Sequence, residues 1–203
     1  MLASNKIMSA STGFLSMYVG PMYSGKTSKL LELYKQFQFC GVKTAVINFG
    51  EDTRYSDTML STHDKTMIEC IMTNTLTEAF PIGTAKGNEK INDIEVFLIN
   101  EGQFFPDIVP WVKTIVSAPY RKRVYICGLD GDFKRNTFGN WLDLIAYSDE
   151  VHKLTSICHT CRRNPALFSH RITEETQQKV IGSDAYIPLC RGCYEDANTV
   201  SEP

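Results

Sequence analysis

The chain has 203 residues with 21 basic and 23 acidic side chains, so its formal net charge at pH 7 is −2. This length allows one substantial core with a small appended module. The charge balance excludes a single-sign field of the kind that binds duplex nucleic acid or an anionic membrane, and no apolar run is long enough to span a bilayer. We therefore expect neither nucleic acid nor a membrane among its partners.

The first twelve residues carry one lysine, no arginine and no apolar segment. This composition argues against a secretory signal and against a mitochondrial transit peptide. We expect a soluble protein of the cytoplasm.

A phosphate-binding loop follows the first predicted strand, the apolar run of residues 14–19. Apolar residues then recur at helical spacing from Leu30 to Phe37, and Cys40-Gly41 ends the pattern. A strand, a glycine turn and a helix in this order bring backbone N–H groups together around a phosphate. Lys26 supplies a cation for the outer phosphates and the Thr27 hydroxyl a ligand for Mg²⁺. The sequence thus predicts a nucleoside triphosphate site, against the alternative of a glycine turn that matches by chance, on the residues Gly20, Pro21, Met22, Tyr23, Ser24, Gly25, Lys26 and Thr27.

Short apolar strands and helical patterns alternate along the next hundred residues. We predict strands at 44–49, 94–99 and 124–127, and helices at 108–118 and 141–147. The polar stretch 52–90 reads as a long loop that contains one helix. This alternation predicts an α/β fold of the P-loop NTPase kind, with a mostly parallel sheet and helices on both faces.

An acidic residue at the end of a neighbouring strand is the expected partner of a phosphate loop. Glu101 follows the strand predicted at 94–99, with Asn100 just before it. A carboxylate there can take the proton of an attacking hydroxyl. The alternative is a glutamate that caps the next helix or pairs with a surface arginine, and Phe104-Phe105 favours a walled pocket over that solvated turn.

Two Cys-x-x-Cys pairs near the C-terminus predict a tetrahedral zinc site formed by Cys158, Cys161, Cys190 and Cys193. Two disulfides or a redox dithiol are the alternatives. We expect His159 to be exposed and not a ligand, and Cys40, Cys70 and Cys127 to be buried structural thiols. A boundary near 152–155 divides the chain into a nucleotide-binding domain, 1–153, and a zinc-binding domain, 154–203.

Several motifs in order resemble the type II thymidine kinases, the family of cellular cytosolic, bacterial and poxvirus enzymes. The likeness runs from Phe14 to Tyr194. The motifs that carry it are the loop 20–27, Asp52-Thr53-Arg54-Tyr55, Thr62-His63-Asp64, residues 101–107, Leu129-Asp130-Gly131-Asp132-Phe133, residues 151–155, both cysteine pairs, and Val180-Ile181-Gly182 ahead of Tyr186.

The resemblance implies Mg²⁺-dependent transfer of a phosphoryl group from ATP to the 5′-hydroxyl of thymidine or deoxyuridine, with Glu101 as general base and a structural Zn²⁺. Beside the loop, it assigns Asp52, Thr53, Arg54, Asn100 and Gln103 to the ATP and Mg²⁺ side. It implies a C-terminal lasso, a loop tied down by zinc that closes over the nucleoside, and a homotetramer with feedback inhibition by the triphosphate end product. The substrate-binding residues implied are Phe104, Leu129, Phe133, Phe138, Gln178, Lys179, Val180, Ile181, Gly182 and Tyr186.

Three departures from the family pattern stand out. The strand-end motif of the family reads Asp-Glu, whereas this chain has Asn100, which predicts weaker Mg²⁺ binding or slower turnover. Asp132 stands where relatives often have a small hydroxyl residue, and the stretch 182–186 is one residue shorter than usual.

Two other functions remain open from the residues themselves. One is a P-loop kinase for another nucleoside, or an ATPase, with a structural zinc module. The other is a zinc-ribbon binding module with a vestigial loop, for which Arg162, Arg163, Arg171 and Arg191 near the cysteines supply some basic character. The intact Lys26-Thr27 pair and Glu101 favour an enzyme.

Overall fold

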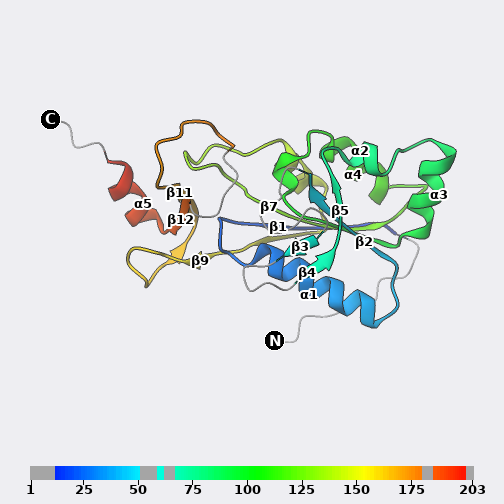
Figure 1. The fold of residues 1–203 in the computed structure, drawn as a ribbon, viewed down its shortest axis with the longest axis horizontal. Coiled ribbons are helices and arrows are strands. Elements are labelled where there is room, and N and C mark those ends of the chain that lie inside the picture. The colour runs from blue at the N-terminus through cyan, green and yellow to red at the C-terminus, as the bar shows by residue number, and fades with distance from the viewer. Residues whose placement is uncertain (1–11, 51–58, 62–66, 180–184, 200–203) are drawn as a thin grey trace.

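Six parallel strands form the central sheet of the computed structural model, which describes residues 12–50, 59–61, 67–179 and 185–199 (Figure 1). Their order across the sheet is β5-β2-β6-β7-β1-β8, and each neighbouring pair is parallel. The strands are β1 (Phe14–Val19), β2 (Thr44–Phe49), β5 (Ile71–Thr73), β6 (Val96–Ile99), β7 (Arg123–Gly128) and β8 (Glu150–Lys153).

The inner strands are apolar on both faces because helices cover both sides of the sheet. All four residues of β6 are buried, and so are five of the six in β1 and in β2. Continuous apolar runs of this kind are typical of covered parallel sheets. The predicted fold class is confirmed, with one boundary moved: Ile94 ends the preceding helix, so β6 begins at Val96.

Helix α1 (Lys26–Phe39) covers one face and packs Leu30, Leu31 and Leu33 against the sheet. Figure 1 shows it on the opposite side of the sheet from α2 and α4. The second face is built around Trp111, Trp141 and other large side chains. The elements that supply this second layer are α2 (Leu76–Ala79), α3 (Ala85–Asp93), α4 (Ile108–Val116) and the 3₁₀ helix η2 (Trp141–Tyr147).

The stretch predicted as a long loop with one helix contains more structure than expected. Besides β5, α2 and α3, the antiparallel pair β3 (Met59–Ser61) and β4 (Met67–Glu69) lies in it. These elements are short, so periodicity did not reveal them. Their capping residues are nevertheless visible in the sequence: Thr75 accepts from the Glu78 backbone N–H, and Thr84 accepts from that of Gly87.

The chain beyond β8 builds small antiparallel pairs around a core of its own. Strand β9 (Ser156–Ile157) pairs with β10 (Pro165–Ala166), and β11 (Phe168–Arg171) pairs with β12 (Tyr186–Leu189). Helix α5 (Arg191–Asn198) follows. Among the described residues, no helix is both long and apolar enough to cross a bilayer.

Candidate active site

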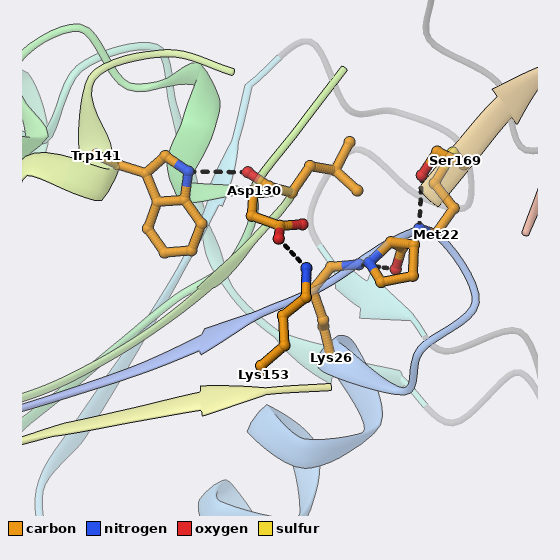
Figure 2. Close-up of polar contacts among 8 residues, drawn as sticks. Met22, Lys26, Asp130, Trp141, Lys153 and Ser169 are labelled. Atoms are coloured by element: carbon orange, nitrogen blue, oxygen red, sulfur yellow. Dashed lines mark hydrogen bonds and ion pairs between the residues drawn. The ribbon is translucent and has the colours of Figure 1, made fainter. Parts of the chain in front are cut away.

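The phosphate loop lies at the carboxyl end of β1 and leads directly into α1. Gly25 has a φ of 83°, a left-handed conformation that favours glycine, and it precedes the first helical residue without a side-chain cap. The N–H groups of the first turn are therefore left for a ligand, as in other anion-binding helix termini. The Lys26 ammonium donates to the Pro21 carbonyl at 2.6 Å (Figure 2).

Two contacts fix this loop to the chain that follows β8. A Cβ atom on Gly20 would come within 2.5 Å of the Leu154 carbonyl oxygen, so only glycine permits this approach. The Met22 backbone N–H donates to Ser169 Oγ at 2.9 Å, and Ser169, on β11, is 4% exposed (Figure 2). The loop therefore lies against both the start of the C-terminal segment and its second hairpin.

Lys26 and Glu101 both act electrostatically on the same buried thiol, Cys127. Burial raises the pKa of Cys127, the Glu101 carboxylate raises it further, and the Lys26 ammonium lowers it. Both charges are thus close enough to act on one sulfur at the end of β7. The predicted phosphate-binding lysine and the predicted base lie together, although 75 residues separate their positions in the chain.

Asn100 sits in a buried polar network between the loop and the sheet. Its Nδ2 donates to Asn48 Oδ1 at 2.8 Å, and its Oδ1 accepts from Cys127 Sγ at 3.0 Å and from Thr27 Oγ1 at 3.4 Å. Asn100 and Asn48 are each 2% exposed. The amide oxygen of Asn100 therefore points toward the hydroxyl that was predicted to bind Mg²⁺. Asn48 carries no local signal, and sequence reasoning missed it.

Glu101 is held at a sharp corner after β6. Its φ of 55° and ψ of 46° are left-handed, and it precedes the 3₁₀ helix η1 (Gly102–Phe104). Gln103 Nε2 donates to Glu101 Oε2 at 2.6 Å, while Gln103 Oε1 accepts the Leu129 backbone N–H at 2.9 Å. Gln103, 5% exposed, thus fixes the orientation of the carboxylate and ties it to the end of β7.

Aromatic side chains wall the space beside Glu101. Phe104 meets Phe138 edge-on with ring centroids 5.3 Å apart, and it meets Phe49 at 5.2 Å. The Lys179 ammonium lies over Phe49 and Phe104, 4.5 and 5.2 Å from their centroids. The backbone of Leu129 is fixed by Trp141, whose Nε1 donates to the Leu129 carbonyl at 2.9 Å (Figure 2). The structure therefore brings the predicted substrate residues Phe104, Phe138 and Lys179 together, and Leu129 contacts Gln103, the neighbour of Phe104 in the chain.

The remaining described lasso residues gather around Arg171, which sequence reasoning considered only for its charge. Its guanidinium lies 3.7 Å from the Phe133 ring centroid and donates to the Tyr186 hydroxyl. It also donates to three carbonyls of the 175–178 backbone, those of Glu175, Gln177 and Gln178. Asp132 Oδ2 accepts from Gln178 Nε2 at 2.8 Å. Asp132, one of the departures from the family pattern, therefore contacts Gln178 of the predicted lasso. Six predicted site residues lie outside the described ranges: Asp52, Thr53, Arg54, Val180, Ile181 and Gly182.

The four cysteines of the two pairs converge on one point. Their sulfurs all lie within 4.8 Å of one another, and Cys161 Sγ is 3.9 Å from Cys190 Sγ. A tetrahedral zinc site with Zn–S bonds of about 2.3 Å has sulfurs about 3.8 Å apart, so the residues fit this ion. His159 is exposed and outside the cluster, as predicted.

The surroundings favour a thiolate at Cys158 and Cys161 and oppose one at Cys193. Burial opposes ionisation of Cys158, but backbone N–H groups of Cys190, Cys161 and Thr160 lower its pKa to about 6. Backbone N–H groups of Asn164 and Arg163 lower the pKa of Cys161. Contact with the Cys190 sulfur, above all, raises the pKa of Cys193 to about 12, because the four sulfurs crowd one another. A central cation relieves this crowding.

The prediction for the other three thiols is partly wrong. Cys127 is buried, but Cys70 is only half-buried and Cys40 is exposed. Cys40 is the C-cap of α1, past the last residues that the helix packs on the sheet. All seven cysteines lie in the described ranges and are free thiols, so the disulfide alternative does not hold.

The residues present also fit a polyphosphate with a hard cation. Ser24 Oγ is buried inside the loop and has no hydrogen-bond partner within the described part of the chain. The Thr27 hydroxyl and the Asn100 amide oxygen lie together and offer oxygen ligands, which Mg²⁺ prefers. The arrangement can therefore hold an anionic group beside a carboxylate that accepts protons.

Comparison with known proteins shows which family this chain is similar to. The family model described as thymidine kinase matches residues 13–194. A thymidine kinase of Dictyostelium discoideum is 38% identical over 93% of this chain and 80% of its own length. The vaccinia virus (strain Western Reserve) thymidine kinase is 38% identical over 91% and 98%, and that of monkeypox virus is 37% identical over the same shares. Domain III of the Thermotoga maritima replication initiation protein DnaA matches 72% of this chain and 56% of that one, with 15% identity and a TM-score of 0.43, too low to inform the comparison.

Proposed function

Since the chain belongs to the thymidine kinase family, we propose that it transfers the γ-phosphoryl group of ATP, with Mg²⁺, to the 5′-hydroxyl of thymidine or deoxyuridine. The observation that carries this proposal is the placement of Glu101. It follows β6, is held by Gln103, and acts on the same thiol as Lys26 of the phosphate loop. An acceptor alcohol between these two groups faces a base on one side and the donor phosphates on the other.

The chemistry follows from these positions. Glu101 takes the proton of the 5′-hydroxyl while the 5′-oxygen forms a new bond to the γ-phosphorus of ATP. The bond between the γ-phosphorus and the bridging oxygen breaks, and ADP leaves with that oxygen. Lys26 and the N–H groups at the start of α1 stabilise the charge on the phosphates. Mg²⁺, held by Thr27 with Asn100 beside it, would neutralise further charge. Gln103 keeps the carboxylate oriented.

The base of the nucleoside belongs, in this proposal, between the aromatic wall and the lasso. Phe104, Phe138 and Leu129 form one side, and Phe133 with Tyr186 the other, each fixed by neighbouring side chains or backbone. Flat apolar faces suit a pyrimidine, and closure of the lasso would exclude water that competes as acceptor. Zinc on the four cysteines would anchor the lasso without taking part in the reaction.

The proposal also covers the division into domains, the oligomeric state and the cellular compartment. We place the boundary between a nucleotide-binding domain and a zinc-binding lasso domain after Lys153, where β8 ends. A homotetramer in the cytoplasm is the arrangement implied by the family resemblance, and the seven free thiols suit a reducing compartment.

The decisive experiment is Glu101→Gln, which keeps the size of the side chain and removes its basicity. With ATP, Mg²⁺ and thymidine we expect kcat to fall by about 10²- to 10⁴-fold, while thermal stability and ATP binding change little. Glu89→Gln, an exposed glutamate on α3, is the matched control and should keep full activity. Unchanged turnover in Glu101→Gln would remove the base from the mechanism. ATP hydrolysis without any thymidine monophosphate in the parent would favour the ATPase alternative.

A further inference from the structure

A row of polar side chains crosses the carboxyl ends of the neighbouring strands β2, β6 and β7. In the register of these strands three isoleucines lie opposite one another, and Asn48, Asn100 and Cys127 each directly follow one of them. Because side chains alternate along a strand, the three polar side chains share one face of the sheet, the face that α1 covers. All three are buried. Buried polar groups need hydrogen-bond partners, so the partners decide how these side chains are oriented.

The hydrogen bonds of Asn100 fix the direction of its amide. Nδ2 donates to Asn48 Oδ1 at 2.8 Å, while Oδ1 accepts from Cys127 Sγ at 3.0 Å and from Thr27 Oγ1 at 3.4 Å. A half-turn of the amide would set the Asn100 oxygen against the Asn48 oxygen, two acceptors with no hydrogen between them. Asn48 therefore keeps the Asn100 oxygen on the side of Thr27.

The direction of the amide decides how the Thr27 hydroxyl can bind a cation. A hydroxyl binds a cation through a lone pair of its oxygen, so its single hydrogen must point elsewhere. Here the hydrogen goes to Asn100 Oδ1, which leaves the lone pairs of the Thr27 oxygen for a cation. A reversed amide would present an N–H group to the hydroxyl, and this donor would compete with the cation for a lone pair.

We propose that Asn48 is a positioning residue for phosphoryl transfer, which acts on the Mg²⁺ site through Asn100 and Thr27. Asn48 accepts from the amide, and the amide oxygen accepts the hydrogen of the Thr27 hydroxyl. The inference rests on the proposed kinase function. It adds a residue of β2, which lies outside both the phosphate loop and the strand-end motif. It also gives the neutral Asn100 a definite role, the alignment of a ligand rather than the supply of a charge.

Equilibrium binding of ADP with and without Mg²⁺ measures this role in the absence of turnover. Both titrations are followed by calorimetry on the full chain, and the ratio of the two dissociation constants gives the contribution of the cation. Asn48→Leu removes the acceptor at similar size, whereas Asn48→Asp keeps an acceptor. Val46→Ala, at a buried position on the same face of β2, is the control for a weakened strand. Asn100→Ala completes a double-mutant cycle with Asn48→Leu.

We expect Asn48→Leu to reduce the Mg²⁺ contribution to ADP binding by about tenfold, the scale of losing a residue that orients a metal ligand. ADP binding without Mg²⁺ should not change. The Mg²⁺ contribution in Asn48→Asp should be at least that of the parent. Val46→Ala should lower the melting temperature and leave the Mg²⁺ contribution unchanged. In the Asn100→Ala background, Asn48→Leu should have no further effect, because Asn48 acts through the Asn100 amide.

An unchanged Mg²⁺ contribution in Asn48→Leu overturns the inference, and so does a parent whose ADP binding does not respond to Mg²⁺. Equal losses in Asn48→Leu and Asn48→Asp also overturn it, as does a full effect of Asn48→Leu in the Asn100→Ala background. Asn48→Val, a smaller side chain that suits a strand, gives the same comparison if Asn48→Leu does not fold. Failure of the parent to phosphorylate thymidine would overturn the proposed function, whereas binding alone tests the role of Asn48.

Discussion

Asn100 shows how one residue can alter a metal site without changing the fold. Its amide replaces the carboxylate of the family pattern, and both of its polar atoms are hydrogen-bonded, to Asn48 on one side and to Thr27 and Cys127 on the other. A neutral amide needs no counter-ion at 2% exposure. It also contributes no negative charge toward Mg²⁺.

We therefore expect Asn100→Asp to lower the Mg²⁺ concentration that gives half-maximal rate by about three- to tenfold, because site charge sets the affinity for hard cations. Without Mg²⁺ the variant should be less stable by about 1–3 kcal/mol, since its buried carboxylate can no longer donate to Asn48. Mg²⁺ titrations by initial rate and by thermal unfolding test both effects. Asn92→Asp, at an exposed position on α3, controls for the charge change. Equal midpoints for Asn100→Asp and the parent would discard the idea.

Strand β11 ends in a buried cation, Arg171, that binds the backbone ahead of the predicted lasso. Arg171, 6% exposed, donates to the carbonyls of the 175–178 backbone and stacks on Phe133. Its guanidinium thereby holds the backbone that leads to the segment we propose closes over the nucleoside. No lysine offers the same fork of donors.

Arg171→Met should keep the bulk of the side chain and lose this hold on the loop. We expect KM for thymidine to rise at least about tenfold and the free energy of unfolding to fall by about 2–4 kcal/mol, because three backbone carbonyls lose their donor. KM for ATP should change less. Arg191→Met, an exposed arginine on α5, is the control. Steady-state kinetics with each substrate varied in turn gives the answer, and an equal rise in both KM values would mean that Arg171 supports the whole site rather than the lasso.

Elements differ in how much of them the sequence alone could predict. The phosphate loop, the paired cysteines and β2 were predicted because each depends on consecutive residues. Strand β8 was not predicted as a strand, although residues 151–155 were recognised as a family motif. Its four residues are exposed at the sheet edge, so they show no apolar pattern. Ser169 was missed because its partner, Met22, lies 147 residues away, and only the folded chain brings the two together.

At the scale of the whole molecule, the chain has two kinds of core. The sheet and its helices bury large apolar clusters on both faces. The segment after β8 buries only a few residues, among them Cys158, Ala166 and Leu189, which is a small core for independent stability. We therefore expect this segment to need a metal ion on its four cysteines in order to fold.

Removal of zinc with a strong chelator should therefore unfold the C-terminal segment and leave the parallel sheet folded. We expect most of the far-ultraviolet circular dichroism to remain, while binding of both substrates weakens by at least about tenfold, because the lasso and the hairpin lose their anchor. Cys161→Ser should reproduce this effect. Cys40→Ser removes an exposed thiol outside the cluster and should retain full zinc content. Global unfolding on chelation would show instead that the two cores are one cooperative unit.

The left-handed backbone at Glu101 places stability and activity in conflict at this position. A carboxylate residue is tolerated in this conformation at a cost of about 1 kcal/mol, which glycine or asparagine would largely avoid. Selection for robustness alone would favour one of those two residues at the corner, and selection for turnover would oppose it. A redesign guided only by thermostability would thus replace the side chain that we propose as the proton acceptor.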